Sequence, residues 1–259
     1  QAPRDMDITI NPDDENIIYM SGILSWFSND GGNNFEISSQ WIPENALNQN
    51  IGYCHADIDI TEFIDGNLFV GSDGGVFKAS QPNTITSSYY QDLSTGLSIR
   101  QFYKIGVSNG NQEMISGGSQ DNGTSVLNNG VWSDWLGADG METFIDKDDS
   151  NFIYGTSQYG KLYLTRNAGQ TFEHLSTPED KAGSDNGANW VVPFEQDPEV
   201  SNKIYVAYDE VFSNTNLEGW IKISQTFSSN IDVMSVAPSN NQTIYISVNN
   251  LMYKTENQG

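Results

Sequence analysis

Residues 153–172 read IYGTSQYGKLYLTRNAGQTF and contain the unit that recurs along the chain. Residues 153–156 and 161–165 have the short apolar runs of two strands joined by a tight turn. A polar turn at 166–169 follows, and Phe172 begins a third strand. Because similar units recur along the chain, its self-similarity predicts the architecture better than any single motif does.

The second turn of this unit fits the pattern Ser/Thr-x-Asp/Asn-x-Gly-x-x-aromatic. The matching residues are Thr165, Asn167, Gly169 and Phe172; Ser28, Asp30, Gly32 and Phe35; and Thr255, Asn257 and Gly259. In such a turn the Asp or Asn side chain accepts backbone N–H groups, and glycine supplies a positive φ. The aromatic residue anchors the turn on the sheet. We interpret the pattern as a device that stabilises the fold rather than as a chemical site.

These residues resemble the Asp-box (BNR) repeat of sialidase-like, sortilin-like and xyloglucanase-like β-propellers. A second signal precedes each copy: an apolar pair, a polar stretch, and then Ile-Tyr or its equivalent. About six copies occur, spaced by roughly 35 to 55 residues, which is the range of propeller blades.

We therefore expect an all-β protein, a β-propeller of four-stranded antiparallel blades with Asp-box turns. About six blades are visible in one domain, 1–259, and we expect them to belong to a larger ring in a longer chain. The expected blades are 5–41, 54–97, 101–135, 140–176, 190–224 and 232–259, the last incomplete. The best helical candidate, 43–50, is short and lies in a connection.

The composition narrows the choice of partners. The net charge is −23, with 34 acidic and 11 basic residues, so the surface repels nucleic acids and anionic membranes. No apolar run is long enough to cross a membrane.

Cys54 is the only cysteine in the sequence, which excludes an internal disulfide. We expect a secreted or cell-surface bacterial protein.

The predicted site follows from the direction of the strands. In a four-stranded antiparallel blade, the turn between the second and third strands lies on the same face as the connections between blades. The residues that we predict to bind a ligand on this face are Asp73, Gln120, Asp121, Asn122, Trp135, Asp139 and Gln158. Acids and amides bind hydroxyl groups and aromatic rings stack on sugars, as a neutral-glycan site requires. The alternative is that the acids only stabilise turns and that Trp135 packs in the core.

Several of these runs are similar to uncharacterised secreted Asp-box proteins of Bacteroidetes-type bacteria, many of which use type IX secretion. The turn 73–75 also resembles the Asp-x-Gly-Gly turns of xyloglucanase-type glycosidases. That resemblance implies an inverting pair of carboxyl groups, for which the weak candidates are Asp73, Asp121 and Asp139. A sialidase needs three arginines that grip a carboxylate. Arg4, Arg100 and Arg166 are the only arginines, and Arg166 lies inside an Asp box, on the face opposite the predicted site. We therefore do not expect the arginine triad of a sialidase or sialidase activity.

The sequence offers no ligand set for zinc and no phosphate-binding loop. We expect no metal or other cofactor, with calcium as the alternative. Oxygen ligands are dense at 57–67 and at 146–149, although neither segment has the spacing of an EF-hand.

Three hypotheses for function remain. The leading one is a non-catalytic propeller that binds a glycan or a protein partner. The second is a glycoside hydrolase that acts on a neutral polysaccharide. The third is a structural spacer or cargo segment. An enzyme requires two carboxyl groups at one site, one of them with a raised pKa, whereas the acids of a spacer bond to their own turns.

Overall fold

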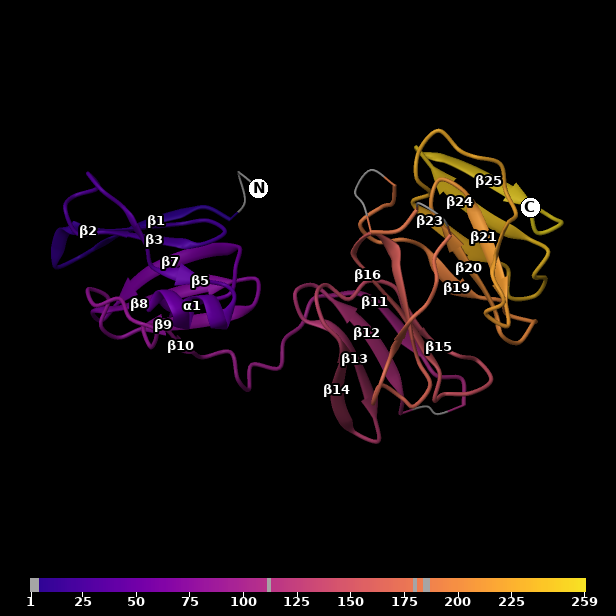
Figure 1. Ribbon diagram of the computed structural model, residues 1–259, viewed down its shortest axis with the longest axis horizontal. Helices are drawn as coiled ribbons and strands as arrows, with labels where there is room; N and C mark the ends of the chain where they lie inside the picture. The colour runs from indigo at the N-terminus through magenta and orange to yellow at the C-terminus, as the bar shows by residue number, and fades with distance from the viewer. Residues whose placement is uncertain (1–4, 111–112, 179–180, 184–186) are drawn as a thin grey trace. The chain divides into compact units, whose positions relative to one another are not determined.

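The computed structural model describes residues 5–110, 113–178, 181–183 and 187–259. The chain forms two compact units, Gln1–Ile99 and Arg100–Gly259, and each is described by itself (Figure 1).

The first unit contains two four-stranded antiparallel sheets. The first sheet consists of β1 (Asp7–Asn11), β2 (Asp14–Ser21), β3 (Ser25–Ser28) and β4 (Glu36–Ile37). The second consists of β7 (Ile58–Ile64), β8 (Asn67–Ser72), β9 (Gly75–Ala79) and β10 (Gln91–Asp92). Between the two sheets, the chain forms the short parallel pair β5 (Ser39–Gln40) and β6 (Gly52–Tyr53) and the helix α1 (Pro43–Gln49). Pro43 begins this helix, and Asn50 ends it in a left-handed conformation. The helix matches the segment 43–50 that the sequence analysis named as the best helical candidate.

The second unit contains four sheets. The third sheet consists of β11 (Phe102–Val107), β12 (Ile115–Ser119), β13 (Gly123–Asn128) and β14 (Val131–Leu136). The fourth consists of β15 (Thr143–Ile145), β16 (Ile153–Ser157), β17 (Lys161–Thr165) and β18 (Glu173–His174), with the 3₁₀ turn η1 (Gln158–Gly160). The fifth consists of β19 (Phe194–Gln196), β20 (Lys203–Ala207), β21 (Val211–Thr215) and β22 (Trp220–Lys222). The sixth consists of β23 (Val233–Val236), β24 (Ile244–Val248) and β25 (Leu251–Thr255).

The prediction of an all-β fold built from propeller-type blades is confirmed. In each of the six sheets the strands pair antiparallel in chain order, within the described part of the chain. The first strands of consecutive sheets in the second unit, β11, β15, β19 and β23, contact one another, so we call them the inner strands. Whether residues 1–259 belong to one ring with the expected blade boundaries stays a prediction. No helix among the described residues is long and apolar enough to cross a membrane.

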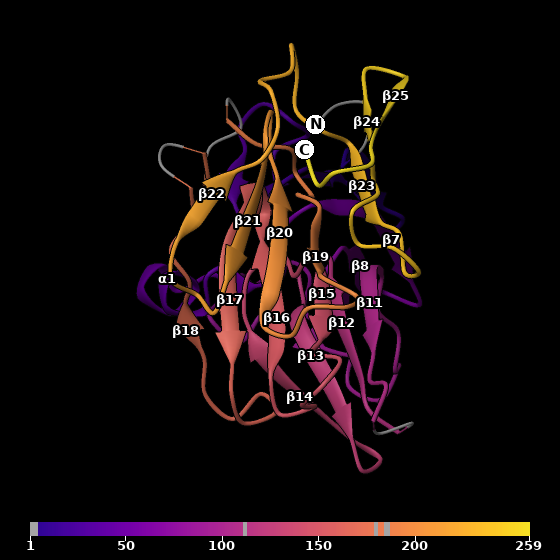
Figure 2. The ribbon, with the colours of Figure 1, turned by 90° about the vertical axis from the view of Figure 1, so that its right-hand side faces the viewer.

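The hydrophobic core lies between consecutive sheets. In β20, Ile204 and Val206 join a cluster with the fourth sheet, whereas Tyr205 and Ala207 join a cluster with the sixth. This division follows from the strand period of two, which points neighbouring side chains to opposite faces. It also explains why the repeated second strand is apolar at consecutive positions. In Figure 2 the fifth sheet lies in front of the fourth, and side chains of the two sheets share one hydrophobic cluster.

The Ser/Thr-x-Asp/Asn-x-Gly turns share one hydrogen-bond pattern. In the fourth sheet, the Thr165 hydroxyl donates to Asn167 Oδ1 at 3.0 Å and accepts the Gly169 N–H at 2.9 Å. The side chain of Asn167 in turn accepts the N–H of Thr171 at 2.9 Å. The turn that begins at Ser28 makes the same contacts, and the one that begins at Thr255 makes the hydroxyl contacts. We call these three turns the box turns.

The other connections between third and fourth strands use different turns. In the third sheet, Asn128 pairs with Val131, and Asn129 and Gly130 both have positive φ. This is the geometry of a tight two-residue hairpin, for which Asn-Gly is the preferred sequence. The second sheet carries a long connection between β9 and β10.

The box turns predict a local stability effect. Thr165 is fully buried, so replacing it with valine removes its hydroxyl contacts and leaves Asn167 Oδ1 and the Gly169 N–H without that partner. We expect Thr165→Val to lower the free energy of unfolding by about 1–3 kcal/mol in urea denaturation.

The matched control is Thr215→Val at the end of β21, because Thr215 holds the same place in its sheet but is exposed. We expect a change of less than about 0.5 kcal/mol there. Equal losses for the two variants would show that the box turn contributes nothing beyond the strand itself.

Candidate functional site

The turns that we predicted to carry ligand-binding residues lie where the direction of the strands predicted them. They join the second and third strands of their sheets: Ser72 pairs with Gly75, Ser119 with Gly123, Ser157 with Lys161, and Ala207 with Val211. In the second unit these turns share a face with the connections between sheets. We call this face, made of residues 119–123, 137–142, 157–161 and 188–193, the rim face.

Asp139 joins two of the other predicted residues into one cluster. Its side chain is buried, and Oδ1 accepts the backbone N–H of Asp121 at 2.8 Å. Oδ2 accepts a hydrogen bond from Nε2 of Gln158. The third and fourth sheets are thus cross-linked by a carboxylate whose two oxygens both bind protein groups. Asp139 therefore has a structural role, whatever else it does.

Close backbone contact holds this connection in place. The Gly123 N–H donates to the Ala138 carbonyl at 2.8 Å, and the Gly140 N–H donates to the Ser119 carbonyl at 3.0 Å. A Cβ atom on Gly140 would lie 2.2 Å from the Gly123 carbonyl oxygen, so only glycine fits there. The Gly-Ala-Asp-Gly sequence at 137–140 is therefore explained by packing as well as by turn formation.

The other polar residues of the turn 119–123 form hydrogen bonds with the backbone and with Arg100. The Gln120 N–H donates to the Gln101 carbonyl at 3.0 Å, and the exposed Asn122 side chain donates to the Gln120 carbonyl at 2.9 Å. The Arg100 guanidinium donates to the Asn122 carbonyl at 3.0 Å and pairs with Asp134 at 3.1 Å. Arg100 therefore braces the turn rather than gripping an anionic ligand. Arg4 lies outside the described residues.

Asp73 belongs to the first unit, whereas Asp121 and Asp139 belong to the second. It is half-buried, and its N–H donates to the Asp57 carbonyl at 3.2 Å. The structure thus brings together Asp121, Asp139 and Gln158 as one cluster.

Trp135 lies in the core instead of on the predicted rim. The pairing of β13 with β14 shifts between Thr124 and Ser125, which makes Trp135 an extra residue in its strand. Such a bulge redirects side chains, and Trp135 is only 5% exposed. It packs against Phe172, with ring centroids 6.4 Å apart. The role of Trp135 as a sugar platform is therefore corrected to one of packing between sheets.

An aromatic cluster lies next to the rim turns, and the predicted ligand-binding residues include none of its members. Trp190 is 41% exposed, and its Nε1 donates to the Tyr103 hydroxyl at 3.1 Å. The ring of Tyr159, the residue after Gln158, meets Trp190 edge to face at 5.2 Å. The register of β11 shifts between Phe102 and Lys104, so Tyr103 is a bulge residue. Trp190 lies in a connection without a strand pattern, and no local signal pointed to it.

Two carboxyl groups, one directly before the inner strand β15 and one in the inner strand β19, were also missed. Glu142 precedes β15 and pairs with Lys104 of β11 at 3.4 Å, while Glu195 lies in β19. The Glu142 N–H donates to the hydroxyl of Thr156 at 2.9 Å, which fixes the residue beside the rim turn. Glu195 Oε2 accepts the Val236 N–H at 3.0 Å. Neither glutamate lies in a turn motif, so the sequence pattern did not distinguish them from surface acids.

Burial sets the ionisation of both glutamates. It raises the pKa of Glu142 from 4.5 to about 7, opposed by the nearby Lys104 ammonium and assisted by the negative charge of Glu195. Burial also raises the pKa of Glu195, whose ionised form is stabilised by the Val236 N–H. The pair thus combines one carboxyl group that titrates near neutrality with a second that accepts a backbone hydrogen bond.

Among the described residues, no cluster of side chains supports the alternative of a bound calcium ion. No group of three or more His, Cys, Asp or Glu side chains that could hold a metal ion occurs among the residues that the structure covers. Asp146 Oδ1 accepts the backbone N–H groups of Asp148 and Asp149, and Oδ2 accepts the Gln196 side chain. These contacts are those of an Asx turn joined to the next sheet.

The raised pKa of Glu142 predicts a pH-dependent stability. Between pH 4.5 and about 7 the folded state holds a proton that the unfolded state releases, so stability falls as pH rises through this window. We expect Glu142→Gln to reduce this pH-dependent loss of unfolding free energy by an amount on the order of 3 kcal/mol. Urea unfolding at several pH values measures the change. The exposed Glu218→Gln is the control, and its profile should stay parallel to that of the parent protein. A parallel profile for Glu142→Gln would contradict the assignment.

No protein-family model and no curated protein matches the sequence. In structure, the chain is similar to an ancestral GH74 enzyme, with a TM-score of 0.47 and 14% sequence identity over 97% of this chain and 36% of the enzyme. It is also similar to the GH74 xyloglucanase from Xanthomonas campestris, with a TM-score of 0.46 and 12% identity over 99% of this chain and 44% of that one. The chain therefore spans less than half the length of either enzyme.

Proposed function

We propose that this protein is a propeller module that binds a neutral glycan on the rim face of its second unit. The observation that carries the proposal is the aromatic cluster of Tyr103, Tyr159 and Trp190 beside the Asp139–Gln158 pair. Aromatic faces with neighbouring amide and carboxylate groups are the combination that carbohydrate hydroxyl and C–H groups require.

The cluster is ordered before any ligand arrives. The hydrogen bond from Trp190 to Tyr103 and the edge contact with Tyr159 hold the indole ring in one orientation. Fixing a side chain in advance lowers the entropy lost on binding. The exposed Asn122 and the half-buried Gln158 supply polar groups on the same face.

Charge supports a neutral ligand rather than an anionic one. The chain carries a net charge of −23, and Arg100 is already engaged by Asn122 and Asp134. An anionic sugar would therefore meet a repulsive field without a free arginine clamp of the sialidase kind.

The finer features of the resemblance belong to the same proposal. We infer that the box turns are Asp boxes and that the protein is sortilin-like or xyloglucanase-like in its repeats, secreted or displayed on a bacterial cell surface. The shared hydrogen bonds of the box turns, the single cysteine and the acidic composition support this inference. The proposed binding requires no cofactor, and a protein partner remains the alternative ligand.

The test is the loss of Trp190. We expect Trp190→Ala to weaken binding to a soluble neutral polysaccharide by about thirtyfold, because an aromatic anchor contributes about 2 kcal/mol or more. Isothermal titration against a panel of neutral polysaccharides, including xyloglucan, β-glucan and mannan, measures the change.

Trp132→Ala is the matched control, because Trp132 is exposed on β14 next to the Asn129-Gly130 hairpin, away from the rim turns. It should bind as the parent protein does. If no polysaccharide in the panel binds the parent protein, or if both variants bind equally well, the glycan proposal fails.

Hydrolysis of the bound glycan is a second candidate function. It rests on Glu142, the last residue of the rim segment 137–142, and on Glu195, which lies two residues after the rim segment 188–193. Burial raises the pKa of both. In this reading protonated Glu142 donates a proton to the leaving oxygen, and ionised Glu195 activates water or attacks the sugar.

The hydrolase hypothesis predicts that replacing either glutamate removes catalysis but leaves glycan binding intact. Glu142→Gln and Glu195→Gln should each reduce the release of reducing sugars by about a hundredfold or more, while the affinity for the polysaccharide persists. The Glu218→Gln variant should retain the parent rate. Unchanged release in both glutamate variants would leave a binding module without catalysis.

A further inference from the structure

Tyr159 of the aromatic cluster has an unfavourable backbone conformation. It is the middle residue of the turn η1 between β16 and β17, with φ 59° and ψ 30°. These values lie in the left-handed region, which residues with a bulky side chain rarely adopt. A tyrosine does not favour this conformation by itself, so contacts from outside the turn are needed to hold it.

The connection between the fourth and fifth sheets, 175–193, supplies two of these contacts. The Tyr159 N–H donates to the Trp190 carbonyl at 3.3 Å, and the Tyr159 carbonyl accepts the Gly183 N–H at 2.8 Å. The backbone is therefore bonded to this connection on both sides of the Tyr159 Cα atom. Because the Tyr159 ring meets the Trp190 ring edge to face at 5.2 Å, the backbone conformation of Tyr159 decides how the two rings meet.

Lys181 fastens the same connection to the fifth sheet. Its ammonium group pairs with Asp209 and, at 3.1 Å, with Glu210, which both lie in the turn between β20 and β21. The three side chains are partly or fully buried, so solvent screens these ion pairs less than it screens pairs on an open surface. Lys181 stands two residues before Gly183, the donor to Tyr159. The ion pairs thus hold the segment that holds Tyr159.

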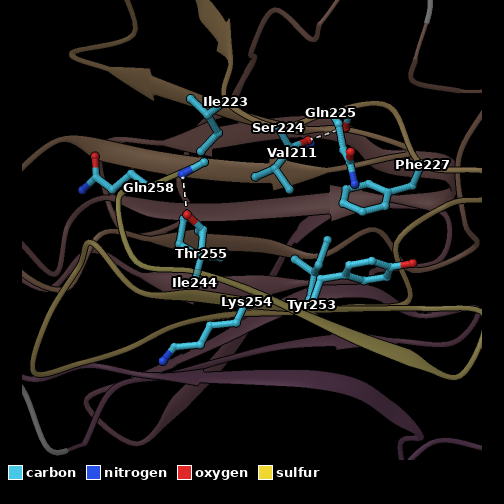
Figure 3. Close-up of a pocket in the computed structure, with 12 residues that line it drawn as sticks. Val211, Ile223, Ser224, Gln225, Phe227, Ile244, Tyr253, Lys254, Thr255 and Gln258 are labelled. Atoms are coloured by element: carbon cyan, nitrogen blue, oxygen red, sulfur yellow. Dashed lines mark hydrogen bonds between the residues drawn. The ribbon is translucent and has the colours of Figure 1, made fainter.

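The turn that receives Lys181 is also held from its other side. The Thr226 hydroxyl donates to Glu210, and the Lys222 ammonium donates to the same carboxylate at 3.0 Å. Figure 3 shows the segment 223–227 beside the first residue of β21, where it forms one wall of a cavity. These contacts do not involve Lys181, so we expect the turn to keep its place when Lys181 is replaced.

We propose that Lys181 is a positioning residue for the glycan site on the rim face. Through Asp209, Glu210 and the segment 181–183, it holds Tyr159 in its left-handed conformation and so fixes the Tyr159–Trp190 pair. Lys181 acts through Tyr159 rather than on the ligand. The hold on the aromatic pair is a property of the chain alone, whereas its consequence for affinity rests on the proposed function.

Lys222 provides the comparison that separates positioning from simple stabilisation. It binds the same carboxylate of Glu210 as Lys181 does, but from β22 instead of from the connection that contacts Tyr159. If the ion pairs only stabilised the fifth sheet, the loss of either lysine would have the same consequence for the aromatic pair. Positioning requires that only the loss of Lys181 disturbs it.

The first experiment observes the Trp190 ring and needs no ligand. With fluorotryptophan incorporated into the intact chain, the Trp190 resonance is the fluorine signal that disappears in Trp190→Phe. We expect Lys181→Met to shift or broaden this resonance, because Tyr159 is then free to leave its conformation. Lys222→Met should leave the resonance unchanged, and Lys181→Arg, which keeps the charge, should restore it.

The second experiment measures affinity by titration calorimetry with a neutral polysaccharide of the panel. We expect Lys181→Met to weaken binding about fivefold, because apparent affinity falls with the population of the binding conformation. Lys222→Met and Lys181→Arg should bind as the parent protein does. A neutral ligand carries no charge to be screened, so high salt should weaken binding to the parent protein but not to Lys181→Met.

The two readouts separate failure of this proposal from failure of the proposed function. An unchanged Trp190 resonance in Lys181→Met, or equal changes in Lys181→Met and Lys222→Met, would overturn the positioning role. Unchanged affinity of Lys181→Met for a polysaccharide that the parent protein binds would overturn it as well and would leave the glycan site intact. If the parent protein binds no polysaccharide, the consequence for affinity falls with the proposed function, whereas an altered resonance still supports the hold of Lys181 on Trp190.

Discussion

The second unit depends on the burial of both faces of the second strand in its sheets. In β20, Ile204 and Val206 pack toward the fourth sheet while Tyr205 packs toward the sixth, and each such side chain contributes about 1.5–3 kcal/mol when buried. One sheet cannot cover two apolar faces, so sheets must stack in chain order. Stacking in turn brings the second-to-third strand turns of several sheets to one face, which is where the proposed binding site lies.

The polar residues of that face divide into two groups. Asp139 bonds to Asp121 and Gln158 through both oxygens, so its first role is to join two sheets. Glu195 lies in the inner strand β19 and Glu142 directly precedes the inner strand β15, and burial raises the pKa of both. The acids with turn signatures thus support the scaffold, and the acids without any motif have the environment of functional groups. This division shifts attention from the rim turns to the inner strands beside them.

Local chemistry explains what was predictable. The box turns, the short helix at 43–50 and the strand pairs around 72–75 and 119–123 follow from side-chain capping, glycine φ preferences and strand periodicity. Trp135 could not be placed this way, because a one-residue bulge in β14 turned its ring into the core. The Tyr103–Trp190 contact joins residues that are distant in sequence, and no local pattern encodes such a contact.

The sequence by itself determined the all-β class, the blade-like repeat, the turn chemistry and the acidic surface. Each depends on residues within one turn or strand, or on a sum over the whole chain. Only the tertiary structure decided which side chains meet: the aromatic cluster and the Lys104–Glu142 pair. Those contacts depend on bulges and on the stacking of sheets, where a shift of one residue reverses the face to which a side chain points.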